Sequence, residues 1–199
     1  MTSMSHRTTS APVSPPTLRR PRVWAWPLAV LLGFPVGGYI ANLIVGAVDS
    51  VSAALVGGLI AGAVVGAAQW LALRRVVSWI WIAATSIGMS AGLALGAALV
   101  DYGIGRVDLM LMGAVTGAVV GGLQAVVLTR QRISGAVWWA VVNPPAWALA
   151  WLVSSYVISA NIDERFTNFG ASGCDVFALL TGLLLEGLFR RTEAQAHTP

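Results

Sequence analysis

Six polar side chains interrupt long apolar stretches of the sequence, and their types could support binding or proton chemistry. They comprise three amides, two hydroxyls and one carboxylate: Gln69, Gln124, Asn143, Thr85, Ser86 and Glu186. Amides and hydroxyls both donate and accept hydrogen bonds, and a carboxylate can also gain or release a proton. Such groups can bind a polar solute or an ion, or they can hydrogen-bond one another.

All six side chains are expected at one depth, near the same end of their apolar stretches. Gln69 and Gln124 each lie six residues before an arginine, which is about 9 Å along a helix. The other four lie five to seven residues from a tryptophan or arginine at the end of a stretch. The sequence therefore predicts a polar layer inside a bundle of helices.

Two interpretations of this layer remain open. It can be a hydrogen-bond network that joins helices, or a pathway for a solute or ion. An ionisable residue inside a membrane is a candidate functional residue, which favours a pathway through Glu186. However, Glu186 precedes Arg190 by four residues and can pair with it at the interface. The Asn143-Pro144-Pro145 stretch adds weight to a pathway, because prolines leave backbone carbonyls unpaired.

The residue types needed for catalysis or for metal binding are scarce. Both histidines, His6 and His197, lie near the chain ends, and no His, Cys, Asp or Glu residues have metal-ligand spacing. The single cysteine, Cys174, excludes an internal disulfide. The glycines lack the Lys-Ser/Thr ending of a phosphate-binding loop. We therefore expect no enzyme activity, no metal and no cofactor.

Composition predicts an all-α integral membrane protein. Only 10% of the residues are charged and 57% are hydrophobic, whereas a soluble domain has about 25% charged residues. Six apolar stretches approach the roughly 20 residues needed to cross a bilayer. They span residues 23–48, 51–73, 78–100, 107–129, 136–160 and 172–189. The basic residues do not cluster, so a nucleic-acid partner is not expected despite the pI of 10.2.

An internal repeat organises these stretches into hairpins. The pentamer Gly-Ala-Val-Val-Gly occurs at 62–66 and again at 117–121, and a 55-residue shift also aligns Gln69 with Gln124. A third, degraded copy is expected to begin at Trp138. The predicted organisation is a disordered tail, six helices in three αα-hairpins about a pseudo-threefold axis, and a short tail. The corresponding ranges are 1–22, 23–191 with repeats 23–77, 78–134 and 135–191, and 192–199.

Rows of glycine at every fourth position are expected to pack the helices together. Such spacing places the glycines on one helix face, where small residues let neighbouring helices approach closely. The three rows are Gly58, Gly62 and Gly66; Gly88, Gly92 and Gly96; and Gly113, Gly117 and Gly121.

Charge and tryptophan placement predict the orientation. Ten of the 12 basic residues lie in the tails and in the even-numbered loops, and such basic segments stay in the cytoplasm. Both termini are therefore expected there. Seven tryptophans are expected to form an aromatic belt at that interface: Trp24, Trp26, Trp70, Trp79, Trp81, Trp138 and Trp139. All basic residues are arginine, which hints at a GC-rich bacterial genome and hence at a bacterial plasma membrane.

The end of the first hairpin resembles a group of small, uncharacterised bacterial membrane proteins. In these proteins a G-x-x-x-G-x-x-Q-W-x-x-L-R-R ending follows a Trp-rich helix. Here the ending runs from Gly62 to Arg75, and the second copy departs from it at Ala125 and Thr129. The resemblance covers most of residues 24–130 and implies no established activity.

These observations favour a non-enzymatic, tightly packed membrane scaffold or accessory subunit. Its expected partners are the lipid bilayer and another membrane protein. The alternative is a carrier or channel for a small solute or ion that uses the polar layer.

Overall fold

The computed structural model describes residues 23–158 and 173–196, and every regular element in these two segments is a helix. The helices are α1 (Ala25–Val45), α2 (Val51–Leu73), α3 (Ile80–Leu99), α4 (Arg106–Arg130), α5 (Val137–Ile158) and α6 (Cys174–Ala196). The expectation of an all-helical chain is confirmed for the described residues.

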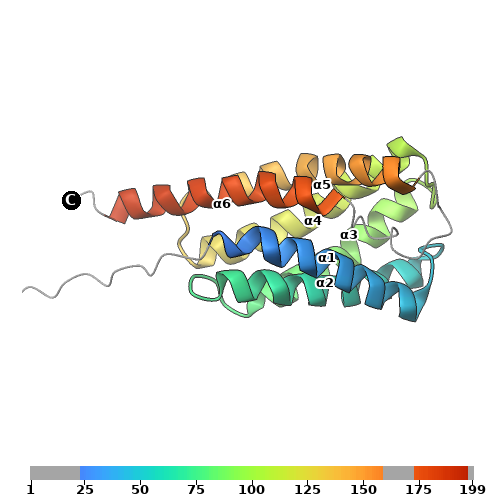
Figure 1. The fold of residues 1–199 in the computed structure, drawn as a ribbon, viewed down its shortest axis with the longest axis horizontal. Helices are drawn as coiled ribbons and strands as arrows, with labels where there is room; N and C mark the ends of the chain where they lie inside the picture. The colour runs from blue at the N-terminus through green and yellow to red at the C-terminus, as the bar shows by residue number, and fades with distance from the viewer. Residues whose placement is uncertain (1–22, 159–172, 197–199) are drawn as a thin grey trace, which may run out of the picture.

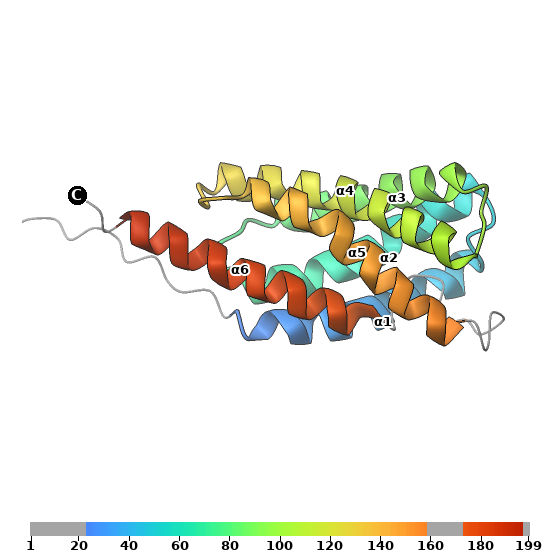
Figure 2. The same ribbon diagram turned by 90° about the horizontal axis from the view of Figure 1, so that it is seen from above.

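The six helices form a closed ring. Each helix packs against the next one along the chain, and α6 returns to pack against α1. Figures 1 and 2 show the helices running along one long axis, with the start of α1 and the end of α6 at the same end. The two contacts of α6 are the least extensive in the ring.

Local sequence explains where the helices begin and end. The turn after α1 uses Gly46 at a φ of 71°, a conformation that glycine adopts without strain. The Ser50 hydroxyl then accepts a hydrogen bond from the Ala53 N–H, capping α2. Asp108 lies in the first turn of α4 and accepts a bond from the Gly105 N–H. Its negative charge also suits a helix N-terminus.

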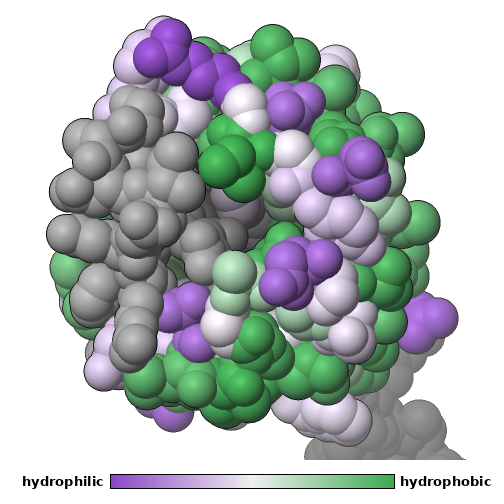
Figure 3. Space-filling model, turned by 90° about the vertical axis from the view of Figure 1, so that its right-hand side faces the viewer, coloured by the Kyte–Doolittle hydropathy of each residue, from purple (hydrophilic) through white to green (hydrophobic). Residues whose placement is uncertain are grey.

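The surface matches a protein embedded in a membrane. Four helices, α1 to α4, are long and apolar enough to cross a bilayer. Many large hydrophobic side chains are exposed along the flanks, among them Leu32, Leu43, Leu95 and Leu183. Figure 3 views the end that carries the α1–α2 and α3–α4 turns, where hydrophilic side chains gather and hydrophobic ones lie around them. The chain is therefore a membrane-embedded, multi-pass helical protein.

The glycine rows face the neighbouring helices. The row on α2 meets α3, the row on α3 meets α4, and the row on α4 meets α5. A methyl group added at Gly92, for example, would lie 2.7 Å from the Cα of Thr116. At such spacing only glycine permits the observed approach of the two backbones.

The ends of the chain were predicted to be tails outside the helical bundle. Helix α6 continues to Ala196, so residues 192–196 of the predicted polar tail are helical. They are held in place because Thr192 accepts a bond from the Ser134 N–H and Gln195 pairs with the Ser134 hydroxyl. The predicted disordered tail at 1–22 lies outside the described residues, as do the end of the chain at 197–199 and most of the α5–α6 connection.

Candidate functional site

One side chain from each of the six helices meets in the ring interior, in what we call the indole layer. Three members are tryptophans from the odd-numbered helices, and three are hydrogen-bond acceptors from the even-numbered helices. They are Trp26, Trp81 and Trp139, with Gln69, Gln124 and Thr181. Each indole is 0% exposed, so these groups are buried in protein rather than in lipid.

Each indole of this layer donates its Nε1–H to an adjacent even-numbered helix. Trp81 donates to Gln69 Oε1 at 3.0 Å, and Trp139 donates to Gln124 Oε1 at 2.9 Å. Trp26 donates to the Thr181 hydroxyl at 2.9 Å. An indole has one donor and no acceptor, so these bonds satisfy the polar requirement of each ring.

The two glutamines also bond each other, which joins α2 to α4. Gln124 Nε2 donates to Gln69 Oε1 at 3.2 Å and to the Thr85 hydroxyl at 2.8 Å. Thr85 in turn donates to the carbonyl of Trp81 at 2.8 Å. A continuous network therefore connects four consecutive helices, α2 to α5, and includes Thr85, one of the six polar residues singled out in the sequence.

The three indoles pack against one another across the ring. Their centroids lie 6.3 Å apart for Trp26–Trp81, 5.6 Å for Trp26–Trp139 and 5.9 Å for Trp81–Trp139. Two of these contacts are edge-to-face, the arrangement in which a positive ring edge meets a negative ring face. The layer thus fills the middle of the ring with aromatic side chains.

Ser86 and Asn143 are buried but do not bond the glutamines. The Ser86 hydroxyl donates to the carbonyl of Leu59 on α2 at 2.7 Å. Asn143 Nδ2 donates to the carbonyl of Trp139 within its own helix at 2.7 Å. Both residues therefore lie beside the indole layer rather than within its network.

Glu186 does not join the interior layer. Its side chain is 44% exposed and pairs with Arg190 at 2.7 Å, four residues further along α6. This is the interfacial pair that the spacing allows, and such exposed pairs contribute little to stability. The structure thus brings five of the six predicted polar side chains into the interior and leaves the carboxylate at the surface.

A second group of polar atoms lies along α5 and has no hydrogen-bond partner within residues 23–158 and 173–196. It comprises Asn143 Oδ1, Trp147 Nε1, Trp151 Nε1 and Ser154 Oγ, all buried. Their spacing of three to four residues puts them on one helix face. The Trp147 ring also packs against Phe34 at 5.4 Å and Phe177 at 5.5 Å. Unpaired polar atoms within an aromatic core are costly, so this face is the least satisfied part of the interior.

The expected aromatic belt is wrong for three of its seven tryptophans. Trp24, Trp79 and Trp138 are exposed, as a belt requires, but Trp26, Trp81 and Trp139 point inward. Residues two apart on a helix lie on nearly opposite faces. The Trp-x-Trp spacing of the first two hairpins was therefore the signal that one ring of each pair turns inward.

Thr181 is a member of the layer that sequence analysis missed. It lies 57 residues after Gln124, close to the 55-residue shift that aligns the two glutamines. A hydroxyl replaces the amide at this position, so a comparison of residue types passes over it. Its own hydroxyl donates to the Phe177 carbonyl while it accepts from Trp26.

Among the described residues, no group of three or more His, Cys, Asp or Glu could hold a metal ion. The site consists instead of indoles, amides and hydroxyls that are buried in a membrane-embedded ring of helices. These features define the class as a multi-pass helical membrane protein with a hydrogen-bonded aromatic interior. Comparisons with models of protein families, with curated proteins and with solved structures found no match.

Proposed function

We propose that this chain is a non-enzymatic membrane scaffold or accessory subunit whose six helices all cross the bilayer. The observation that carries the proposal is the filled interior, in which Trp26, Trp81 and Trp139 contact one another with no exposed surface. A ring closed in this way presents its outer apolar faces for contact with another membrane protein.

Packing energetics support the same function. A solute crossing the ring would have to separate three indoles and break their bonds to Gln69, Gln124 and Thr181. Each buried donor left unpaired costs about 1–3 kcal/mol. The network therefore holds the helices in one arrangement, which suits a rigid body that another subunit can recognise.

Three matching hairpins are part of this proposal. In each hairpin the odd helix carries an inward tryptophan in its first turn, and the even helix carries an acceptor that bonds the tryptophan of a neighbouring hairpin. The tryptophans are Trp26, Trp81 and Trp139, and the acceptors are Gln69, Gln124 and Thr181. This pattern supports a pseudo-threefold relation, although Thr181 departs in residue type.

The proposed orientation places both termini in the cytoplasm of a bacterial cell. We expect a cysteine introduced at Asp101, in the Cys174→Ser background, to react with a membrane-impermeant maleimide in intact cells. A cysteine at Gln131 should react only after the membrane is opened, because its turn lies at the opposite end. Both positions are exposed, so accessibility of the side chain does not bias the comparison. Labelling of Gln131→Cys alone in intact cells would reverse the orientation.

A carrier or channel is the second candidate, and the polar face of α5 favours it. Asn143 Oδ1, Trp147 Nε1 and Ser154 Oγ are buried and have no partner among the described residues, and water or a solute could satisfy them. The limited contacts of α6 with α1 and α5 offer a place where the ring could open. In this alternative the indole layer acts as a closed gate.

A flux assay separates the two candidates. The purified chain is reconstituted into liposomes loaded with a potassium-sensitive dye or with radiolabelled small solutes. We expect leakage no faster than from protein-free liposomes, because the indoles fill the ring. Saturable flux that is lost in Asn143→Leu and kept in the exposed variant Gln131→Leu would overturn the scaffold proposal.

A photo-crosslinking scan tests the scaffold function directly. Photoreactive residues replace one exposed leucine on each of four helices: Leu43, Leu95, Leu123 and Leu179. A stable partner should give a discrete adduct from one side of the ring and none from the other. An adduct of twice the 20.7 kDa chain mass would identify a second copy as the partner. No adduct from any of the four would contradict the proposal.

A further inference from the structure

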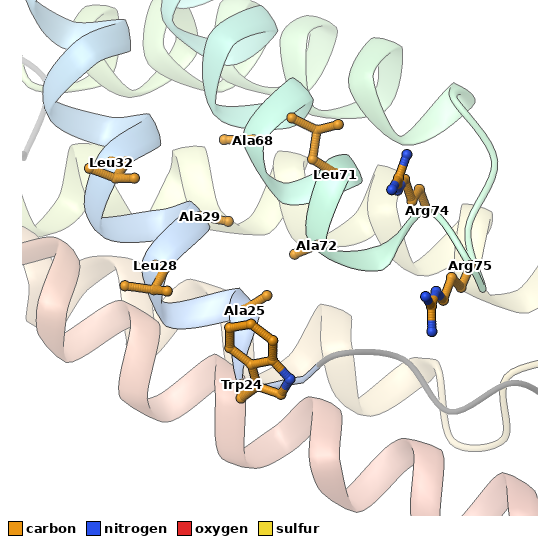
Figure 4. A pocket seen from close by; sticks show the side chains of 10 residues that line it. All are labelled: Trp24, Ala25, Leu28, Ala29, Leu32, Ala68, Leu71, Ala72, Arg74 and Arg75. Carbon is orange, nitrogen blue, oxygen red and sulfur yellow. The ribbon is translucent and has the colours of Figure 1, made fainter.

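A groove lies on the outer surface of the ring, between the start of α1 and the end of α2. Its volume is about 300 Å³. Four alanines form its floor, three leucines its rim, and one tryptophan and two arginines close one end (Figure 4). In that order they are Ala25, Ala29, Ala68 and Ala72; Leu28, Leu32 and Leu71; and Trp24, Arg74 and Arg75.

Glycine packing explains why the groove exists. Farther along the two helices, α1 and α2 meet closely, since a methyl group added at Gly37 would lie 2.9 Å from the Ala61 carbonyl oxygen. At Gly33 a methyl group would lie 3.1 Å from the Ala68 Cβ. Beyond this contact, alanine side chains face one another and are too short to fill the space. The rim leucines, Leu28, Leu32 and Leu71, are more than half exposed, so the groove opens toward the hydrocarbon.

The arginine end of the groove carries unbalanced positive charge. Arg74 and Arg75 follow the last residue of α2 and are both exposed. In the described part of the chain, neither guanidinium forms an ion pair with a carboxylate. Trp24, 68% exposed, lies at the same end (Figure 4), and an exposed tryptophan is typical of the membrane interface. Guanidinium groups bind phosphate through paired hydrogen bonds.

We propose that this groove binds one anionic phospholipid. Its phosphate contacts Arg74 and Arg75, and the upper part of one acyl chain lies on the alanine floor beside Leu28 and Leu71. From Trp24 to Leu32 the groove follows eight residues of α1, or about 12 Å, which matches the upper half of an acyl chain. The pattern of basic groups at the interface above an apolar intramembrane groove is one that recognises anionic head groups.

Other occupants fit the groove less well. A second copy of the chain, related by a twofold axis along the membrane normal, would bring its own Arg74 and Arg75 to the same level, where like charges repel. A free phosphate ion would leave the apolar part of the groove unused. Lipid binding in this groove requires membrane insertion, but it does not depend on whether the protein is a scaffold or a carrier. A negative result for lipid binding is therefore distinguishable from a negative result for the proposed function.

The second hairpin supplies a matched comparison. At the end of α4, Arg130 corresponds to Arg75, but Thr129 replaces the first arginine and Ile80 replaces Ala25. Both changes remove features of the groove, namely its paired charge and its open floor. Arg130 and Arg132 therefore serve as a control at the same end of the ring, with the same number of charges removed.

Lipid retention by the full-length chain tests the proposal. The protein is purified in a mild detergent, supplied with phosphatidylglycerol or phosphatidylcholine of identical acyl chains, and examined by native mass spectrometry. We expect one phosphatidylglycerol to be retained about tenfold more strongly than phosphatidylcholine. The preference should disappear in Arg74→Gln/Arg75→Gln and persist in Arg130→Gln/Arg132→Gln.

A second variant tests the groove apart from its charge. Ala29→Leu fills the floor without altering any arginine, and it should weaken retention of both lipids at this site. Unchanged helicity and melting in detergent show that Ala29→Leu is folded. If it is not folded, the arginine variants alone test whether the groove binds the lipid. Equal retention of the two lipids by the wild type, or equal loss in the control, would overturn the proposal. Displacement of the lipid by millimolar inorganic phosphate would identify an ion site instead.

Discussion

Replacing Gln69 and Gln124 together by leucine is expected to lower the free energy of unfolding by about 2–5 kcal/mol. The double variant leaves the indole N–H groups of Trp81 and Trp139 buried without an acceptor. It also removes the donor that bonds the Thr85 hydroxyl. Each buried donor without a partner costs about 1–3 kcal/mol. Water cannot replace the lost acceptors, because the two indoles are fully buried.

If the two glutamines bonded only each other, replacing both by leucine would leave the free energy of unfolding almost unchanged. Apolar replacement is nearly neutral only when both partners of a hydrogen bond change. Here the partners include two tryptophans that remain in place. The network interpretation of the polar layer therefore does not imply tolerance to leucine at Gln69 and Gln124.

Unfolding in mixed micelles, followed by near-ultraviolet circular dichroism, measures this effect because the signal reports directly on the tryptophans. Gln131→Leu makes the same chemical change at an exposed turn and should unfold like the wild type. The two single variants complete a double-mutant cycle. Since Gln124 donates directly to Gln69, their effects should differ from additivity by about 0.5 kcal/mol or more. Additive effects, or wild-type stability of the double variant, would contradict the network.

Replacing Gly58 and Gly62 together by alanine is expected to destabilise the protein by about 2–4 kcal/mol. The new methyl groups would lie 2.6 Å from the Met89 carbonyl oxygen and 2.7 Å from the Ser86 Cα. Both neighbours are backbone atoms, which cannot move aside by a side-chain rotation. Helices α2 and α3 must separate, and the bond from the Ser86 hydroxyl to Leu59 is then lost.

A matched control lies elsewhere in the helices. At Gly122 an added methyl group would meet nothing within 4 Å, so Gly122→Ala tests the backbone effect of the substitution alone. Alanine favours a helix over glycine by up to about 1 kcal/mol, and this variant should therefore be neutral or slightly stabilising. Thermal melting in detergent distinguishes the two outcomes. Similar melting of both variants would show that glycine packing is not what holds α2 against α3.

The sequence was sufficient to predict the elements and much of their packing. Long apolar stretches define helices because a backbone in lipid must satisfy its own hydrogen bonds, and the bounds of α2 agree with the predicted stretch at 51–73. Glycines at every fourth position identified the faces on which neighbouring helices meet. The same spacing placed Gln69 and Gln124 in the interior, since each amide lies on the glycine face of its helix. These features depend on local periodicity, which the sequence states directly.

Only the tertiary structure decided which side chains complete the site. In a lipid-embedded bundle both the interior and the exterior are apolar, so hydrophobicity does not tell the two faces of a helix apart. Trp24 and Trp26 have the same residue type and opposite positions, because the rotation of α1 is fixed by Gly33 and Gly37 against α2. Thr181 accepts from Trp26 only because α6 closes the ring against α1. Contacts between the first and last helices depend on ring closure, a property of the whole chain that no local pattern encodes.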